Sequence, residues 1–293
     1  MATIAWGGAC VRAESPEGMV PSPLERLIPL HKRLGPPQPG DWRTTHPEPG
    51  QTYRQYLRSR PVTPDKARRI IYVQPLGTFT TTQERIIQLS AEYMGIYFHL
   101  PVKIREGLSL DLIPAKARRR HPEWGTNQIL STYVLQEVLY PRLPADAVAF
   151  IAFTTSDLWP GEGWNFVFGQ ASLSHRVGVW SIHGLGDPHE SDDSFRLCLR
   201  RTLKIATHET GHMFSMHHCT YYECNMCAAN HLTEADRQPL WLCPVCLAKL
   251  LWATKADPQK RFQRLATFGE AHGLTAEQEF FEKSLAVLRG KRP

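Results

Sequence analysis

Short apolar runs alternate along the chain with longer segments in which apolar residues recur every three or four positions. The run that starts at Ile70 is rich in β-branched residues and ends at Pro75 and Gly77, so it predicts a strand. Residues 147–155 form an unbroken apolar run of strand length, which is typical of a strand buried on both faces. A further strand region is predicted over 102–114.

Helical periodicity follows the strand that starts at Ile70 and the strand region at 102–114. The segment 80–101 repeats apolar residues on one face, and Thr81 and Glu84 match a capping box at its start. A second helix is predicted over 126–140, with Thr126 as its N-terminal cap. The resulting order of strand, helix, strand, helix, strand favours a parallel sheet with helices packed on it.

The pattern changes beyond the third strand, where no helix separates two predicted strands at 164–173 and 177–185. Gly169 interrupts the first of them and indicates a bulge or a close approach by another part of the backbone. A long helix is predicted from about Ser194 onward. Its apolar residues occupy two faces, so we expect this helix to lie inside the protein.

The two ends of the chain differ from this middle part. Residues 1–67 hold 11 of the 23 prolines and predict an extended or poorly ordered arm, with one short helix at 24–34. Two more helices are predicted near the C-terminus. One opens with Pro258 at its first position, and the other has a capping box from Thr275 to Gln278.

Composition and charge are those of an ordinary globular protein, with 42% hydrophobic and 21% charged residues. No apolar run approaches the roughly 18–20 residues that a membrane span needs, and the first residues do not resemble a signal peptide. The net charge of +6 includes a basic cluster at 116–120, which we interpret as a surface turn because no aromatic residues interleave with it. We expect a cytoplasmic monomer with no nucleic-acid or membrane partner.

Candidate metal ligands and catalytic side chains are most concentrated in HETGHMFSMHHC, residues 208–219. His208 and His212 are four residues apart on the predicted long helix, so they point the same way and can share one metal ion. Glu209 can reach a metal-activated water without being a ligand, as metal-assisted peptide hydrolysis requires. A catalytic zinc keeps three protein ligands and one open position. The third ligand is expected to be His218, which requires a sharp turn near Ser215.

Five of the seven cysteines lie in one short stretch after these histidines. An odd count without a secretion signal disfavours a disulfide framework, and the clustering indicates metal. By spacing alone, Cys224, Cys227, Cys243 and Cys246 form a zinc-ribbon pattern. A second set replaces Cys227 with Cys219, and spacing leaves the choice open. Either set predicts a closed structural zinc site, separate from the histidine site.

Together these motifs resemble the archaemetzincins, which are metzincin-clan zinc metallopeptidases of archaea and vertebrates. The resemblance covers roughly residues 70–255 and rests on HETGHMFSMHHC, on the following CNM, and on CPVC. It implies a peptide or protein substrate, a general base at Glu209 and a methionine turn at Met226 under the metal. It also implies two zinc ions per chain. Their ligands would be His208, His212 and His218 for the catalytic ion, and Cys219, Cys224, Cys243 and Cys246 for the structural ion.

The resemblance further implies a metzincin-like zincin fold of the α/β class. We expect a mixed, mostly parallel sheet with packed helices, a long active-site helix, a zinc-knuckle insertion and C-terminal helices. The chain would divide into the arm at 1–67, a catalytic domain at 68–255 and a helical extension at 256–293. Substrate is expected to add as a further strand along the sheet edge. That edge would comprise Gly169, Gln170, Ala171 and Ser172.

One departure from the family pattern concerns the turn before the third histidine. Archaemetzincins have glycine where this chain has Ser215, and a side chain in a left-handed conformation costs roughly 1–2 kcal/mol. This substitution leaves His217 as an alternative ligand to His218. It also supports a rival hypothesis, in which a zinc-stabilised module binds a protein or peptide with little or no catalysis. The retained Glu209 favours catalysis, because a pure binding module needs no carboxylate there.

Overall fold

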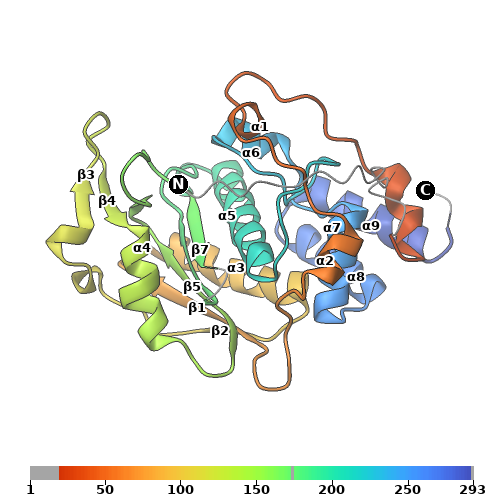
Figure 1. The fold of residues 1–293 in the computed structure, drawn as a ribbon, viewed down its shortest axis with the longest axis horizontal. Helices are drawn as coiled ribbons and strands as arrows, with labels where there is room; N and C mark the ends of the chain where they lie inside the picture. Colours follow the sequence, from red (N-terminus) through yellow and green to blue (C-terminus); the bar gives the residue numbers. More distant parts are fainter. Residues whose placement is uncertain (1–19, 173–174, 292–293) are drawn as a thin grey trace, which may run out of the picture.

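The computed structural model describes residues 20–172 and 175–291. The first 19 residues of the predicted arm, including Cys10, lie outside these ranges. Within the described chain, a five-stranded sheet runs through the left part of the molecule in Figure 1. Its strands follow the order β2 (Val102–Ile104), β1 (Ile70–Leu76), β5 (Ala147–Thr154), β8 (Val177–Ser181) and β7 (Gly169–Ser172).

The sheet is mixed and mostly parallel, as the sequence predicts. β1 pairs in parallel with β2 and β5, β5 pairs in parallel with β8, and only β7 runs antiparallel to its neighbour. All residues of β5 are buried because alternate side chains enter two different cores. Ile151 and Phe153 face one core, whereas Phe150 and Ala152 face the other.

Helices cover both faces of this sheet. α3 (Thr81–Phe98) and α5 (Asp192–Met213) pack together on one face, and α5 also contacts β7 and β8. Figure 1 shows α5 beside β7. The other face is covered by a continuous helical segment that changes its winding. It comprises α4 (Ser131–Tyr133), a π-helical stretch (Val134–Leu139) and a 3₁₀ turn (Tyr140–Arg142).

The predicted helix over 126–140 is wrong in its first part. Residues 127–130 form strand β4, which belongs to a second sheet in the order β3, β4, β6. Ile129 pairs with Arg118 on one side and with Leu158 on the other, and apolar spacing alone could not distinguish this pairing from a helix turn. The other two strands of this sheet are β3 (Arg118–Arg120) and β6 (Asp157–Trp159).

The right part of the molecule in Figure 1 joins the described part of the arm to the C-terminal helices. The arm contains a 3₁₀ helix (Leu24–Leu30), α1 (Trp42–Thr45) and α2 (Tyr53–Arg58). The later helices are α6 (Leu232–Arg237), α7 (Pro244–Thr254), α8 (Pro258–Ala271) and α9 (Thr275–Leu288). Leu27 of the arm and Phe281 of α9 belong to the same buried cluster as α3 and α5.

Several predicted boundaries need correction. The capping box of α3 uses Thr80 and Gln83, one residue earlier than predicted. α5 begins after Ser191, whose side chain accepts a hydrogen bond from the Ser194 amide, so it starts earlier than predicted, with Asp192 and Asp193 in its first turn. α9 has Leu274 at its cap position and no side-chain cap, so the predicted box there is wrong.

The strands predicted at 102–114, 164–173 and 177–185 are shorter than expected. The first of these segments is a strand only over β2, and the described chain beyond it contains short 3₁₀ turns at Leu110–Leu112 and Ala115–Ala117. β7 pairs with β8 without a shift in register, so Gly169 is not a bulge. Across the described ranges, no helix is long and apolar enough to cross a membrane.

Candidate metal centre

Helix α5 carries two of the predicted ligands in its last turns. His208 and His212 lie one turn apart, and their Nε2 atoms are 3.0 Å from each other. The Nδ1 atom of His208 bonds to the carbonyl oxygen of Asn225 at 2.7 Å, and that of His212 bonds to the carbonyl oxygen of Met216 at 2.6 Å. Because a carbonyl oxygen only accepts, both Nδ1 atoms must donate, which leaves both Nε2 atoms free as ligands.

The third imidazole arrives through the predicted sharp turn. Ser215 has a φ of 63°, in the left-handed region, and the amide of Met216 bonds back to the carbonyl oxygen of Gly211. His218 then lies beside the other two rings, with ring centroids 5.4 Å from His208 and 4.8 Å from His212. The ligand atoms of the three histidines lie within 4.8 Å of one another.

His217, the alternative ligand, is exposed and is not part of this three-histidine group. The strained turn is held by contacts from the arm. The amide of Val62 donates to Ser215 Oγ at 3.0 Å, and Gln51 Nε2 donates to the Ser215 carbonyl oxygen at 3.2 Å. Tyr56 Oη donates to the carbonyl oxygen of Phe214 at 2.9 Å. A serine is therefore tolerated where glycine would suit the backbone, because its hydroxyl group gains a partner.

Glu209 is partly buried between the histidine group and strand β7. A Cβ atom added at Gly169 would lie 3.4 Å from Cγ of Glu209 and 3.0 Å from the Trp180 ring. The absence of a side chain at Gly169 therefore lets Trp180 pack closely against the strand, with Glu209 nearby. Burial raises the pKa of Glu209 to about 7, and the neighbouring His218 partly opposes that rise.

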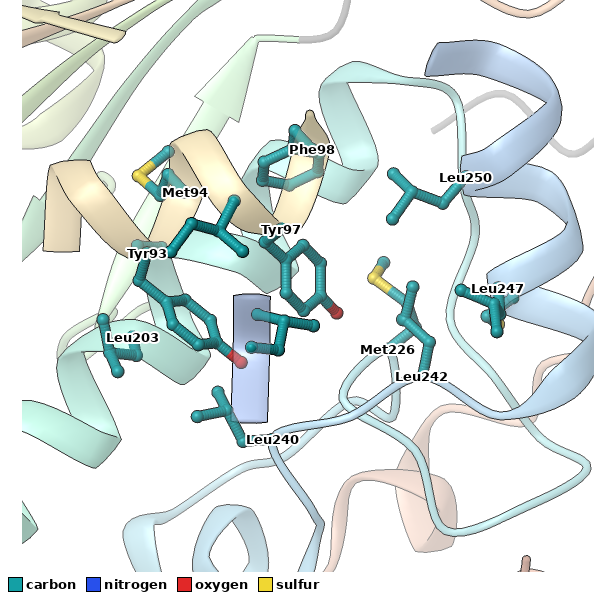
Figure 2. Close-up of a cluster of buried hydrophobic side chains, with 14 of the residues drawn as sticks. Tyr93, Met94, Tyr97, Phe98, Leu203, Met226, Leu240, Leu242, Leu247 and Leu250 are labelled. Atoms are coloured by element: carbon teal, nitrogen blue, oxygen red, sulfur yellow. The ribbon is translucent and has the colours of Figure 1, made fainter. Parts of the chain in front are cut away.

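Met226, which the resemblance predicts to form a methionine turn, packs against helix α5 close to His212. It is 1% exposed, and a Cβ atom added at Gly211, next to His212, would lie 2.6 Å from its sulfur atom. Figure 2 shows this side chain in a buried cluster between Tyr97 and helix α7. The carbonyl oxygen of Met226 accepts a hydrogen bond from the amide of Cys219. Met226 thus contacts both the end of α5 that carries His212 and the segment that carries Cys219.

Four buried cysteines form a second group, and their sulfur atoms lie within 4.8 Å of one another. The group comprises Cys219, Cys224, Cys243 and Cys246. Cys227 is not a member, and its thiol contacts the carbonyl oxygen of Tyr222 at 3.2 Å. None of the six described cysteines forms a disulfide. The amide of Cys243 donates to the sulfur atom of Cys224 at 3.2 Å, an arrangement that stabilises a thiolate.

Both groups fit zinc by the spacing of their donor atoms. Nitrogen ligands at 2.0–2.1 Å around a tetrahedral ion lie roughly 3.3 Å apart, close to the 3.0 Å between His208 and His212. Sulfur ligands at about 2.3 Å would lie roughly 3.8 Å apart, and the sulfur atoms of Cys219 and Cys243 are 3.7 Å apart. The histidine group provides three ligands beside a cleft, whereas the cysteine group provides four and is buried.

The cleft beside the histidines has a volume of about 510 Å³. One wall is formed by residues 163–169, which include the aromatic side chains of Trp164, Phe166 and Phe168. Trp42 of the arm and residues 228–230 also line it. Glu209 is the one acidic side chain among the lining residues that the structure describes. The cleft therefore combines a reactive centre with apolar walls.

The basic cluster at 116–120 supports this wall. Arg119 donates to the carbonyl oxygens of Trp164 and Asn165 at 3.0 and 2.9 Å, and its guanidinium group lies over the ring of Trp159. Arg118 donates to the carbonyl oxygen of Ile113 at 2.8 Å. These side chains hold backbone in place, which is a structural role for a cluster that the sequence predicts to be only a surface turn.

The predicted substrate strand is at the edge of the described sheet. β7 comprises Gly169, Gln170, Ala171 and Ser172, and it pairs with β8 on one side only. The side chain of Gln170 accepts a hydrogen bond from the hydroxyl group of Ser131 at 2.6 Å, which ties the strand to α4. Gly169 of this strand lies next to Glu209 and lines the cleft beside the histidine group.

Two residues near the histidines were missed by the sequence analysis, and both come from the arm. Glu48 contacts Nδ1 of His218, with its two oxygen atoms at 2.8 and 3.0 Å, and Trp42 packs edge-on against the same imidazole. Glu48 is 170 positions from His218. No local pattern in a proline-rich segment indicates such a contact.

A third set of possible ligands comprises Asp41, His231 and Glu234. Their polar atoms already serve the arm. Asp41 pairs with Arg237 at 2.5 Å, and the carboxylate of Glu234 accepts from the amides of Trp42 and Asn230. These contacts neutralise the group and explain it as an anchor for the arm.

Comparison with known proteins decides the family. Residues 140–251 match the family model described as peptidase family M54. The chain is 34% identical over 262 residues to Archaemetzincin-2 of Pongo abelii, which covers 78% of this chain and 71% of that protein. The chain belongs to the archaemetzincin family. An archaemetzincin of Thermococcus kodakarensis is 32% identical to it over 191 residues, or 62% of this chain and 96% of that protein.

The fold agrees with a solved member of the family. The crystal structure of archaemetzincin from Methanopyrus kandleri matches with a TM-score of 0.53 and 26% identity, over 66% of this chain and 99% of that one. The predicted metzincin-like α/β class is therefore confirmed. Family membership makes this archaemetzincin a zinc metallopeptidase, and hence a hydrolase.

Proposed function

We propose that this archaemetzincin hydrolyses peptide bonds at the three-histidine site, with Glu209 as general base. We further propose that a second zinc ion, held by the four cysteines, stabilises the fold. One observation carries the catalytic assignment. The Nδ1 atoms of His208, His212 and His218 all have acceptors, so their Nε2 atoms face one another beside a carboxylate and an open cleft.

The chemistry divides between the ion and the chain. Zinc held by the three histidines would polarise a peptide carbonyl and lower the pKa of a water molecule. The Glu209 carboxylate would accept the proton of the water as its oxygen atom attacks the carbonyl carbon. As the C–N bond breaks, the same carboxyl group would return that proton to the leaving nitrogen. Glu209 directly follows His208 in α5, so this helix determines where the carboxylate lies relative to the ligands.

Substrate binding is assigned to the sheet edge and the aromatic wall. A peptide that adds to β7 would place its backbone beside Gly169 and Glu209. Trp164, Phe166 and Phe168 would then contact one of its side chains. Because few charged groups line the cleft, we expect a preference for peptides with a large apolar side chain near the cleaved bond. Each buried side chain of this kind contributes about 1.5–3 kcal/mol.

The zinc-stabilised binding module was the rival hypothesis, and its main support was Ser215. The turn at Ser215 nevertheless brings His218 to the other two histidines, so the serine does not prevent assembly of the site. The cleft beside Glu209 also favours catalysis. The rival hypothesis would be supported by a library experiment in which the protein binds peptides and cleaves none.

The experiment is cleavage of a diverse peptide library by the protein as purified with zinc. We expect cleavage, with large apolar residues enriched next to the cleaved bond. Trp164→Ala should lower kcat/KM for the preferred peptides roughly tenfold through lost contact area. Tyr140→Ala is the matched control, because Tyr140 is similarly exposed but packs on His175 away from the cleft. No cleavage by wild-type protein that carries zinc would favour the binding module.

A further inference from the structure

We infer that Glu48 in the N-terminal arm is a positioning residue for the metal ligand His218, so the arm completes the catalytic centre. The inference rests on the proposed function of the three histidines. The carboxylate of Glu48 accepts from Nδ1 of His218 through both oxygen atoms, at 2.8 and 3.0 Å. The side chains of Glu48 and His218 are 29% and 22% exposed, so solvent screens this pair only partly.

The three histidines differ in what holds their rings. His208 and His212 belong to helix α5, and their Nδ1 atoms bond to backbone carbonyl oxygens. His218 lies outside any helix, three residues after the left-handed Ser215, so its backbone fixes its ring less firmly. Its Nδ1 partner is a carboxylate from a distant segment. A ligand on a loop therefore receives the strongest acceptor, and that acceptor must itself be held.

The arm holds Glu48 at defined points. Asp41 pairs with Arg237 of α6 at 2.5 Å, and the amide of Trp42 donates to the carboxylate of Glu234 in the same helix. The indole Nε1 of Trp42 then donates to Glu48 at 3.3 Å. Trp42 also packs against the imidazole of His218. The chain of contacts runs from α6 through the arm to the ligand.

The carboxylate would act on His218 in two ways. Accepting the Nδ1 proton selects the tautomer whose Nε2 lone pair faces the other two histidines. A negatively charged acceptor also makes the imidazole a stronger electron donor toward a metal ion. Loss of such a partner typically weakens metal affinity or activity by about 10–100-fold. The effect should be specific to the histidine site, since Glu48 is not part of the cysteine group.

The test measures zinc release rather than activity alone. Wild type, Glu48→Ala and Glu48→Gln, each loaded with zinc, are mixed with a chromophoric chelator, and the release phases are resolved. The phase that is missing in His212→Ala identifies the histidine site. We expect this phase to be about 10–100-fold faster in Glu48→Ala. Glu48→Gln should fall between that variant and wild type, because an amide oxygen still accepts the Nδ1 proton.

The control is Glu223→Gln, which makes the same chemical change at another contact between arm and body. Glu223 pairs with Lys32 at 2.5 Å and is not one of the three-histidine group. Zinc release from its histidine site should match that of wild type. The melting temperature of each variant is measured as well, so that a general loss of stability is recognised. In cobalt-substituted protein, the visible absorption of the histidine site should shift in Glu48→Gln but not in Glu223→Gln.

Two results would overturn the inference. Wild-type release rates and spectra in both Glu48 variants would show that the contact does not influence the site. Equal effects of Glu48→Gln and Glu223→Gln would show only that the arm is generally loosened. If wild type has no release phase that His212→Ala abolishes, the proposed histidine zinc site fails instead, and the two failures are thereby distinguished.

Discussion

Ser215 shows at the scale of one residue how a departure from a family pattern is accommodated. Its φ of 63° suits glycine, yet its hydroxyl group accepts a hydrogen bond from the amide of Val62. The conformation costs roughly 1–2 kcal/mol, and the hydrogen bond returns roughly 0.5–1.5 kcal/mol. The two terms nearly cancel, which explains why a serine can occupy the turn.

This balance predicts how two substitutions differ. Ser215→Ala keeps the backbone strain and loses the hydrogen bond, so it should lower the free energy of unfolding by about 1 kcal/mol. Ser215→Gly loses the same bond but relieves the strain, so its stability should stay within about 1 kcal/mol of wild type and exceed that of the alanine variant. Chemical denaturation measures both. An alanine variant as stable as wild type would contradict this account of the turn.

At the scale of elements, the segments that the sequence predicted best are those with long apolar stretches buried in a core. The continuous apolar run of β5 indicates a strand, and the periodic apolar residues of α5 indicate a helix. Both elements were predicted within a few residues of their bounds. β4 was predicted as helix because Ile129 and Leu130 fit either period, and only pairing with β3 and β6 decides between them. The starts of α3 and α5 lie one or more residues from the predicted positions, because neighbouring polar residues compete for the N-cap position.

The cysteine knuckle provides a prediction for an element that has little regular structure of its own. Cys243→Ser removes one donor from the buried group of four, so it should lose one zinc ion and lower the melting temperature by roughly 5 °C or more. Cys227→Ser should keep the metal and melt near wild type, because Cys227 lies outside the group. Elemental analysis and thermal denaturation check both. A greater loss at Cys227 would restore the ribbon spacing as the ligand set.

At the scale of the whole molecule, the catalytic centre is assembled from distant parts of the chain. The spacing of His208, His212 and His218 predicted that these histidines converge, with His217 as the alternative third ligand, because a helix repeat and a tight turn are local features. The role of the arm could not be predicted in the same way. Trp42 and Glu48 are held near the site by contacts of the arm with α6 and with the turn at Ser215, and such contacts leave no periodic signal in a proline-rich segment.

The two donor groups set the metal content of the whole molecule. Protein purified without chelators should carry about two zinc ions per chain, and Cys243→Ser and His212→Ala should each carry about one. Removing both ions with a chelator should lower the melting temperature more than removing the histidine-site ion alone, since closed thiolate sites contribute directly to folding. Elemental analysis that finds one ion or none in wild type would contradict the two-site assignment.

The central claim is that Glu209 moves the proton at a three-histidine zinc site, and Glu209→Gln tests it most directly. The amide keeps the shape of the side chain but loses its basicity, and the three histidines are unchanged. We expect wild-type zinc content and melting temperature, with kcat/KM for the best library peptide lower by roughly 10²-fold or more. His212→Ala should lose one zinc ion together with activity. Cleavage by Glu209→Gln at the wild-type rate would show that another group is the base.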